Sequence, residues 1–492
     1  MLRISTAQPP SRNPACSRRA DTAICLLLVS LWIALWTLQN NAFARERPNV
    51  IFFLSDDHRA DLLGCAGHPV LKTPVIDRLA QNGVRFQNMF VTTSICAASR
   101  ATLFTGMFER THKFTFRTPP LARNLTDVSY PRLLKDAGYR TGFVGKFGVN
   151  IPRAEREKMF DFFSPTNRNP YFKKQPNGRT RHITELAGDR AIGFLRAQSS
   201  GQPFCLSVSF HAAHAEDSDK VNHFPWPRAV EHLYQQTELP EPRLSDPQIF
   251  ARQPEFLRKS MNRQRWFWRW DTRQKYQRNL RGYYRMISGL DLVMGRVLDT
   301  LSELGMSDNT VIIFSGDNGY YAGERGFAGK WSHYEESLRV PLVIFDPRLE
   351  KAQRGKVCQA LALNVDIAPT ITALAGLTPS EHQGQSLLPL LSAPAPKSWR
   401  QDFFCEHLFD HMAIPKWEGV HEQRWVYARY FQQQPTFEFL HDLQADPDQV
   451  QNLATDANYA AELTRLQKRC DELRTRYGGI YTPQNFPTVN RR

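Results

Sequence analysis

The clearest pattern along this chain is a set of short, apolar, β-branched runs that alternate with segments of helical periodicity. Runs of this kind are typical of buried strands, and the amphipathic segments between them are typical of helices that cover a sheet. The strand-like runs lie at 50–54, 141–144, 204–210, 310–314 and 340–345. The helical segments lie at 74–82, 128–137, 183–198 and 283–304. The alternation predicts an α/β fold in which a doubly wound, mainly parallel sheet carries helices on both faces.

A smaller unit follows a linker of alternating Ala and Pro near 393–396. Its pattern predicts strands around Phe403, at 425–431 and at 437–440, and then a helix from about 457 to 476. We therefore expect a C-terminal α+β subdomain with an antiparallel sheet at 396–492. The larger α/β domain is expected at 45–395, with an insertion at 215–282.

The first 44 residues are predicted to be a secretory signal peptide. Arg18 and Arg19 precede an apolar run at 23–38, and Ala42-Phe43-Ala44 offers a small-x-small cleavage site. The run is shorter than the roughly twenty residues that cross a bilayer, although an uncleaved anchor is the alternative. We expect an exported protein, periplasmic or extracellular, with no stable membrane span once residues 1–44 are removed.

The formal net charge is +15, and about +12 remains when the leader's four Arg and one Asp are removed. A basic surface favours an acidic partner: nucleic acid, anionic lipid, or a sulfated or phosphorylated polymer. Export argues against nucleic acid. Two of the eight cysteines belong to the leader. If Cys96 is reserved for chemistry, five remain, and an odd number spread over more than 400 residues does not indicate a disulfide scaffold.

The predicted insertion contains a basic and aromatic stretch, Arg265-Trp266-Phe267-Trp268-Arg269-Trp270. Such a stretch can stack on bases or sugars and hold phosphates or sulfates. An insertion that packs its Trp side chains on the domain is an equally good interpretation.

Polar side chains directly follow four of the predicted strands. These are Asp56-Asp57, Gly145-Lys146, His211 with His214, and Asp317-Asn318. Open α/β sheets bind ligands at the carboxyl ends of their strands, so we expect these groups to meet. Asp56, Asp57, Asp317 and Asn318 offer hard oxygen ligands, the set that suits Ca²⁺ or Mg²⁺ rather than zinc.

Cys96 opens the run Cys96-Ala97-Ala98-Ser99-Arg100. A helix at 99–105, closed by Gly106, puts Cys96 at the helix N-terminus, where free amides and the dipole stabilise an anion. Arg100 lies four residues on and faces Cys96 if the segment is helical. The run therefore predicts an anion site.

Taken together, these residues resemble the formylglycine-dependent sulfatase family of the alkaline-phosphatase-like superfamily. The resemblance covers nearly the whole mature chain. It rests on the motifs RPNVIFFLSDD, TPVIDRLAQNGVRFQNMF, CAASRATLFTG, GYRTGFVGK, FSGDNG, GKWSHYEESLRVPLVIFDP and HDLQADPDQVQNLA.

The resemblance implies that a maturation enzyme oxidises Cys96 to Cα-formylglycine (3-oxoalanine), whose hydrate attacks the sulfur of a sulfate ester. It implies one Ca²⁺ held by Asp56, Asp57, Asp317 and Asn318, with the modified Cys96 as a further ligand. It implies that Arg100, Lys146 and Lys330 stabilise the hydrate and the sulfate oxygens. His214 matches the histidine that protonates the leaving oxygen, and His211 is the alternative.

Two positions depart from the family pattern. Gly145-Lys146-Phe147-Gly148 stands where the family commonly has Gly-Lys-x-His, and His112 or His333 is the candidate for the missing role. Ala98 stands where many members have Pro.

The implied function is hydrolysis of sulfate from a sulfated carbohydrate. The alternatives are a phosphonate monoester or phosphodiester hydrolase, or a non-catalytic glycan-binding protein on the same scaffold. The oligomeric state is left open.

Overall fold

The computed structural model describes residues 47–199 and 201–488, so the predicted signal peptide at 1–44 lies outside the described residues. From Pro48 onwards the chain forms one compact unit. Its centre is an eight-stranded sheet with the strand order β13-β2-β12-β9-β1-β8-β4-β5. Within the described ranges, no helix is both long enough and apolar enough to span a bilayer.

Seven strands of this sheet share one direction, and β12 alone of its described strands runs against its neighbours. The prediction of a mainly parallel sheet is therefore confirmed. The strands are β1 (Asn49–Ser55), β2 (Val84–Phe86), β4 (Arg140–Gly145), β5 (Phe162–Pro165), β8 (Phe204–Ser209), β9 (Thr310–Gly316), β12 (Leu342–Phe345) and β13 (Lys356–Cys358).

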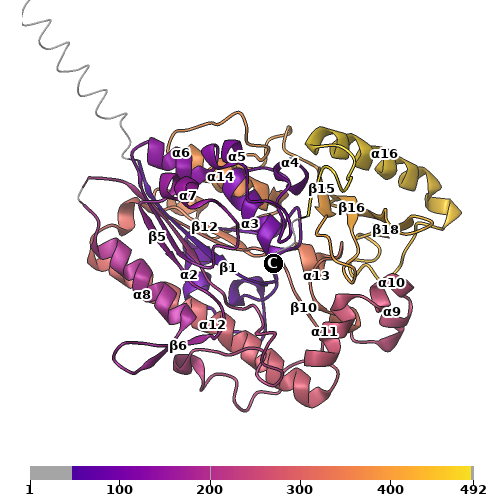
Figure 1. Ribbon diagram of the computed structural model, residues 1–492, viewed down its shortest axis with the longest axis horizontal. Coiled ribbons are helices and arrows are strands. Elements are labelled where there is room, and N and C mark those ends of the chain that lie inside the picture. Colours follow the sequence, from indigo (N-terminus) through magenta and orange to yellow (C-terminus); the bar gives the residue numbers. More distant parts are fainter. Residues whose placement is uncertain (1–46, 200, 489–492) are drawn as a thin grey trace, which may run out of the picture. The chain divides into compact units, whose positions relative to one another are not determined.

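Helices cover both faces of the sheet, as the pattern predicts (Figure 1). One face carries α2 (Pro74–Asn82), α8 (Ile183–Arg196) and α12 (Arg273–Glu303). The other carries α3 (Cys96–Thr105), α6 (Tyr130–Asp136), α7 (Arg153–Met159) and α14 (Ile367–Leu374). Because β1 is covered on both sides, its alternating residues enter two separate cores, Phe52 in one and Phe53 in the other.

Helix α12 begins ten residues before the predicted start at 283. Thr272 caps it, because its side chain accepts a hydrogen bond of 3.3 Å from the Lys275 amide. Tyr276 and Leu280 extend the buried stripe by two further turns. The polar residues between them hid this part of the helix from the sequence pattern.

The segment between β8 and α12 contains three short helices: α9 (Pro247–Ala251), α10 (Glu255–Arg258) and α11 (Met261–Arg269). Trp270, 4% exposed, packs against Phe224 and Tyr276 with ring centroids 5.6 and 5.8 Å away. For Trp270 the packing interpretation of the aromatic stretch is therefore correct.

The C-terminal part is an antiparallel four-stranded sheet, as predicted. Its strands are β15 (Asp402–His407), β16 (Trp417–Glu422), β17 (Trp425–Tyr430) and β18 (Phe437–Asp442), and α16 (Ala460–Tyr477) packs on it (Figure 1). The sequence pattern missed β16, whose Glu418, Gly419 and Glu422 interrupt the apolar run.

The C-terminal sheet is joined to α4 (Glu109–His112) by Arg110, which is buried between Glu406 and Glu418 at 2.8 Å from each. A boundary between two domains near 395 stays a prediction.

Candidate active site

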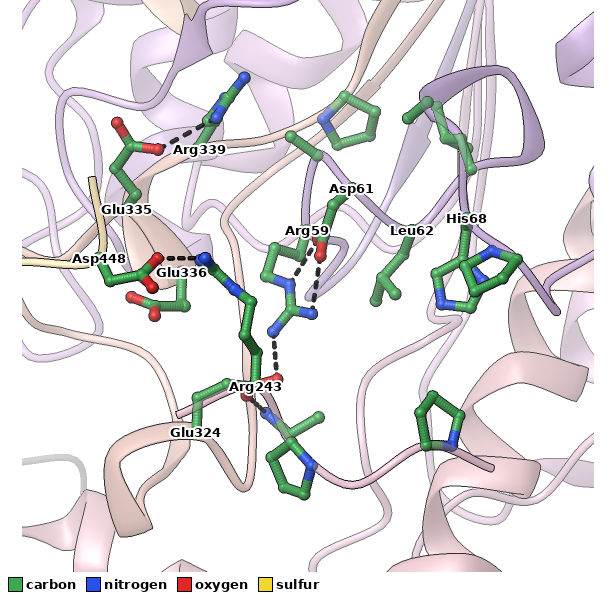
Figure 2. A pocket seen from close by; sticks show the side chains of 18 of the residues that line it. Arg59, Asp61, Leu62, His68, Arg243, Glu324, Glu335, Glu336, Arg339 and Asp448 are labelled. Carbon is green, nitrogen blue, oxygen red and sulfur yellow. Dashed lines mark hydrogen bonds and ion pairs between the residues drawn. The ribbon is translucent and has the colours of Figure 1, made fainter. Parts of the chain in front are cut away.

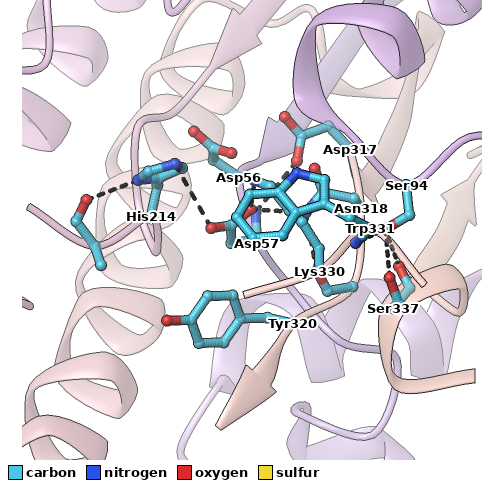
Figure 3. Close-up of polar contacts among 12 residues, drawn as sticks. Asp56, Asp57, Ser94, His214, Asp317, Asn318, Tyr320, Lys330, Trp331 and Ser337 are labelled. Atoms are coloured by element: carbon cyan, nitrogen blue, oxygen red, sulfur yellow. Dashed lines mark hydrogen bonds and ion pairs between the residues drawn. The ribbon is translucent and has the colours of Figure 1, made fainter. Parts of the chain in front are cut away.

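Four neighbouring strands bring the predicted polar groups to one edge of the sheet. Strands β9, β1, β8 and β4 are adjacent and parallel, so the residues that follow them converge. Figure 3 shows the side chains of Asp56, Asp57, Asp317 and Asn318 pointing toward one another. Hydrogen bonds join these two chain segments, which lie more than 250 residues apart in the sequence. The Asn318 amide donates to Asp57 Oδ1 at 2.7 Å, and the Asp57 backbone amide donates to Asp317 Oδ1 at 3.2 Å.

The turn after β1 is held in an unusual conformation. Asp57 has φ 53°, in the left-handed region that Asp tolerates better than most residues. Tyr283 of α12 donates a hydrogen bond of 2.5 Å to the Asp57 carbonyl. A helix on one face of the sheet thereby fixes the turn that presents both aspartates.

Cys96 is the first residue of α3, three residues before the predicted helix start. Ile95 is extended, and Gly106 ends the helix in the left-handed region at φ 65°. The thiol, 4% exposed, lines a cavity of about 520 Å³. Its Sγ and carboxylate oxygens of Asp56 and Asp317 lie within 4.8 Å of one another.

Arg100 links α3 to three strand ends. Its Nε donates to Asp317 Oδ2 at 2.8 Å, and its Nη1 donates to the Lys146 carbonyl at 2.6 Å and also to Ser209 Oγ. Burial opposes the charge of this guanidinium, but Asp317 and Asp56 raise its pKa above the usual value. The side chain is therefore a fixed, buried cation.

Each of the two predicted lysines pairs with one aspartate: Lys146 with Asp56 and Lys330 with Asp57. Burial acts to raise the pKa of Asp56, but Lys146 and the other nearby cations hold it well below its usual range. Burial and then the neighbouring Asp56 raise the pKa of Asp317 to about 6. Three carboxylates thus face three cations in a buried site.

The arrangement fits a hard divalent cation. Asp56 Oδ1 and Asn318 Oδ1 are buried and have no hydrogen-bond partner in the described structure. Buried polar atoms without a partner call for an explanation such as a bound ion. Oxygen donors of this kind suit Ca²⁺ or Mg²⁺, so Asp56, Asp57, Asp317 and Asn318 are the residues that would hold it.

Comparison with known proteins identifies the family. Residues 48–377 match the family model described as Sulfatase, and residues 323–476 match the model described as N-sulphoglucosamine sulphohydrolase, C-terminal. The chain belongs to the sulfatase family. It is accordingly an enzyme of the sulfuric ester hydrolase class, as the sequence motifs predict.

Individual relatives agree with this assignment. The chain is 28% identical to an N-acetylglucosamine-6-O-sulfatase of Bacteroides thetaiotaomicron, over 88% of this chain and 87% of the relative. It is 26% identical to PehA of Trinickia caryophylli, a multifunctional alkaline phosphatase superfamily protein, over 84% and 93% of the two chains. A solved structure described as in complex with its substrate D-glucosamine-2-N,6-O-disulfate is 25% identical. It superposes with a TM-score of 0.77 over 88% of this chain and 98% of its own.

In this sulfatase His214 and His211 both line the cavity. The Nε2 atom of His214 lies 3.8 Å from Asp57 Oδ2, and its Nδ1 contacts the Ala215 carbonyl at 2.7 Å. Burial, and then the adjacent Arg168 guanidinium, lower its pKa well below the ordinary value. His211 Nε2 lies 3.0 Å from the Thr166 carbonyl, and burial lowers the pKa of His211 to about 3. Both rings are therefore neutral at pH 7.

The structure does not place His112 or His333 among the cavity-lining residues. His112 Nε2 lies 3.1 Å from Thr102 Oγ1, and its Nδ1 accepts from the Phe114 amide. His333 lies 3.0 Å from the Tyr430 hydroxyl and 3.2 Å from His441. The ring nitrogens of both histidines are therefore engaged by residues outside the cavity lining, and a role for either one in place of the missing histidine stays a prediction.

The cavity also contains charged residues that the sequence did not single out as a cluster. Asp217 accepts a hydrogen bond of 3.2 Å from Arg265, also pairs with Arg269, and lies 3.8 Å from Arg168. The Arg265 guanidinium lies 4.8 Å from the Trp331 ring centroid. The basic and aromatic stretch was a signal for Arg265, whereas nothing in the local sequence marked Arg168. The site therefore has more positive charge than the catalytic motifs alone provide.

A separate pocket of about 550 Å³, remote in its lining from the Cys96 cavity, lies between Arg59, Arg243, Glu324 and Asp448 (Figure 2). Its charged groups neutralise one another: Arg59 contacts Glu324 at 2.7 Å, and Arg243 pairs with Asp448. The side chains that line it, all within the described ranges, include no Cys, Ser or Thr. Unlike the Cys96 cavity, it therefore offers no candidate precursor of a nucleophile.

Proposed function

We propose that this sulfatase releases inorganic sulfate from a sulfated carbohydrate, using a formylglycine made from Cys96 and one bound Ca²⁺. The observation that carries the proposal is the convergence of Cys96 with Asp56, Asp57, Asp317 and Asn318 in one buried site. Formylglycine would supply an aldehyde hydrate as the nucleophile, and Ca²⁺ would polarise the sulfate and lower the pKa of the attacking hydroxyl.

The other residues provide charge and protons. Arg100, Lys146 and Lys330 are fixed cations around Cys96, and they suit sulfate oxygens whose negative charge rises in the transition state. Loss of one contact of this kind typically costs about 3–4 kcal/mol. His214 is the candidate acid for the leaving oxygen, because its ring lines the cavity beside Asp57. Burial and Arg168 lower its pKa, so the ring would have to gain a proton in the substrate complex before it could act as the acid.

A sulfated amino sugar is the substrate class that the relatives support best. One relative is an N-acetylglucosamine-6-O-sulfatase, and one similar structure holds a disulfated glucosamine. The cavity of this chain suits such a ligand because Trp331 and Phe409 offer apolar surface for a sugar ring. Arg168 and Arg265 add positive charge beside it.

Export and maturation belong to the same proposal. The leader at 1–44 predicts a periplasmic or extracellular enzyme. Conversion of Cys96 requires a maturation enzyme that accepts Ala98 in the signature. The basic net charge suits a polyanionic glycan.

Two measurements test the proposal. The first compares kcat/KM on aryl sulfate and aryl phosphate esters, with Cys96→Ala as the inactive control. A preference for phosphate would instead support the phosphonate monoester or phosphodiester hydrolase, the alternative suggested by the similarity to PehA.

The second measurement is mass spectrometry of the Cys96 peptide after expression with a competent maturation enzyme. A mass below that of the thiol peptide is expected for the aldehyde. An unchanged thiol together with affinity for sulfated glycans would support the non-catalytic binding protein.

A further inference from the structure

A second cavity, of about 670 Å³, adjoins the Cys96 cavity and shares His411 and Ile414 with it. We propose that this second cavity binds an acidic saccharide residue next to the sulfated one, so that the substrate is an oligosaccharide rather than a single sugar. This inference rests on the proposed sulfatase function and adds the neighbouring unit of the substrate.

The wall between the two cavities is a fixed loop that connects β15 to β16. His411 and Ile414 form an antiparallel bridge across its tip, and the Ala413 amide donates to His411 Nδ1 at 3.1 Å. The Met261 amide donates to the Ala413 carbonyl at 2.8 Å, so α11 holds the tip in place. Because the two cavities share His411 and Ile414, a chain bound at Cys96 would pass this loop to reach the second cavity.

The charge of the second cavity favours an acidic ligand. Arg117 is exposed, and its guanidinium lies 5.9 Å from the Phe409 ring centroid. Lys259 forms an ion pair with Glu255 in which both side chains are exposed, and such pairs contribute little free energy. Lys416 is buried and pairs with Asp410 at 2.6 Å. Three cations against one carboxylate in the cavity leave positive charge for a sulfate or a uronate.

The same cavity offers the surface that a sugar ring needs. The Met412 side chain is fully exposed at its rim, and Phe256 and Ile414 add apolar area for a pyranose face. Gln432 and Gln433 supply amide donors and acceptors for hydroxyl groups. Ligand sites commonly measure about 300–1,000 Å³. The Cys96 cavity alone is therefore large enough for one sulfated sugar, and the second cavity is available for its neighbour.

The test compares kcat/KM on three defined substrates: a sulfated monosaccharide, a tetrasaccharide with an acidic neighbour, and a tetrasaccharide with a neutral neighbour. The wild-type enzyme is expected to prefer the acidic tetrasaccharide by about tenfold or more. The double variant Arg117→Gln/Lys259→Gln is expected to lose this preference while its activity on the monosaccharide stays unchanged. Arg258→Gln is the matched control, since Arg258 is exposed beside Lys259 but does not line the cavity.

Equal kcat/KM on all three substrates, or a preference that survives the double variant, would overturn the inference while leaving the sulfatase activity intact. Absence of hydrolysis on every sulfate ester would instead overturn the proposed function. In that case calorimetric titration with the sulfated tetrasaccharide still tests the second cavity. The double variant is then expected to bind about tenfold more weakly than wild type, and equal affinity would contradict the inference.

Discussion

Gly148 lies directly against the side chain of Arg100: a Cβ placed on Gly148 would lie only 2.7 Å from Arg100 Cδ. Gly148 also has φ 73°, in the left-handed region that favours glycine. Arg100 cannot easily yield, because Asp317, Lys146 and Ser209 all hold its guanidinium. Gly148, which stands where the family commonly has histidine, therefore has to be small because Arg100 lies against it.

Gly148→Ala is expected to lower kcat/KM by about tenfold or more, because the added methyl group displaces Arg100 from its contacts. Gly178→Ala is the matched control, since Gly178 has φ 78° but nothing within 4 Å of an added Cβ. Gly178→Ala therefore introduces the same strain of a positive φ, but its added methyl group contacts no other residue. Steady-state kinetics and thermal unfolding of both variants check the prediction, and equal losses of activity would contradict it.

Removal of calcium is expected to abolish activity and to lower the free energy of unfolding. At a free Ca²⁺ concentration one hundred times Kd, the bound ion contributes about 2.7 kcal/mol. The apoprotein should stay folded, because Arg100, Lys146 and Lys330 already face the three carboxylates. Unfolding followed with chelator and with added Ca²⁺ measures the difference.

Asp56→Asn serves as the control for the calcium experiment, because it weakens the donor set at the atom that lacks a partner. Its stability should no longer depend on Ca²⁺. A wild-type enzyme that is equally stable and active with chelator would count against a calcium site.

His407 is expected to make the fold sensitive to acid. Burial, and then Lys416, lower its pKa to about 3 from an ordinary value of 6.5, and neither ring nitrogen has a hydrogen-bond partner in the described structure. Below about pH 6.5 the unfolded chain binds a proton that the folded chain does not bind until about pH 3, so stability is lost as the pH falls.

His407→Phe should therefore reduce the loss of stability between pH 8 and pH 5 by about 2 kcal/mol. Urea unfolding at the two pH values measures this, and the value at pH 8 isolates any change in packing. An unchanged pH dependence in the variant would refute the assignment.

Arg110→Met is expected to destabilise the protein by about 3–5 kcal/mol, because it leaves the buried carboxylate of Glu406 without its cation. Glu418 loses one of its partners but keeps Arg429 and Arg474. Arg132→Met is the control: Arg132 pairs with Asp136 on an exposed helix face and should cost less than about 1 kcal/mol. Urea unfolding compares the two variants, and similar losses would contradict the prediction that the Arg110 ion pairs stabilise the fold.

Much of the central fold could be predicted because its pattern is local. A strand covered on both faces is continuously apolar, as in β1 and β9, and an amphipathic helix repeats every three to four residues, as in α2 and α8. The pattern failed where polar residues interrupt an element, as in β16 and the first turns of α12. There the partner that buries the element comes from another part of the chain.

For the active site, the sequence by itself determined that Asp56-Asp57, Lys146, His214 and Asp317-Asn318 share one edge, because the carboxyl ends of parallel strands lie together. Only the tertiary structure decided that Arg168 and Arg265 meet at Asp217, that Gly148 touches Arg100, and that His112 and His333 point elsewhere. These contacts join loops from distant segments. The positions of these loops depend on how the helices and sheets pack, and the local periodicity of the sequence does not predict that packing.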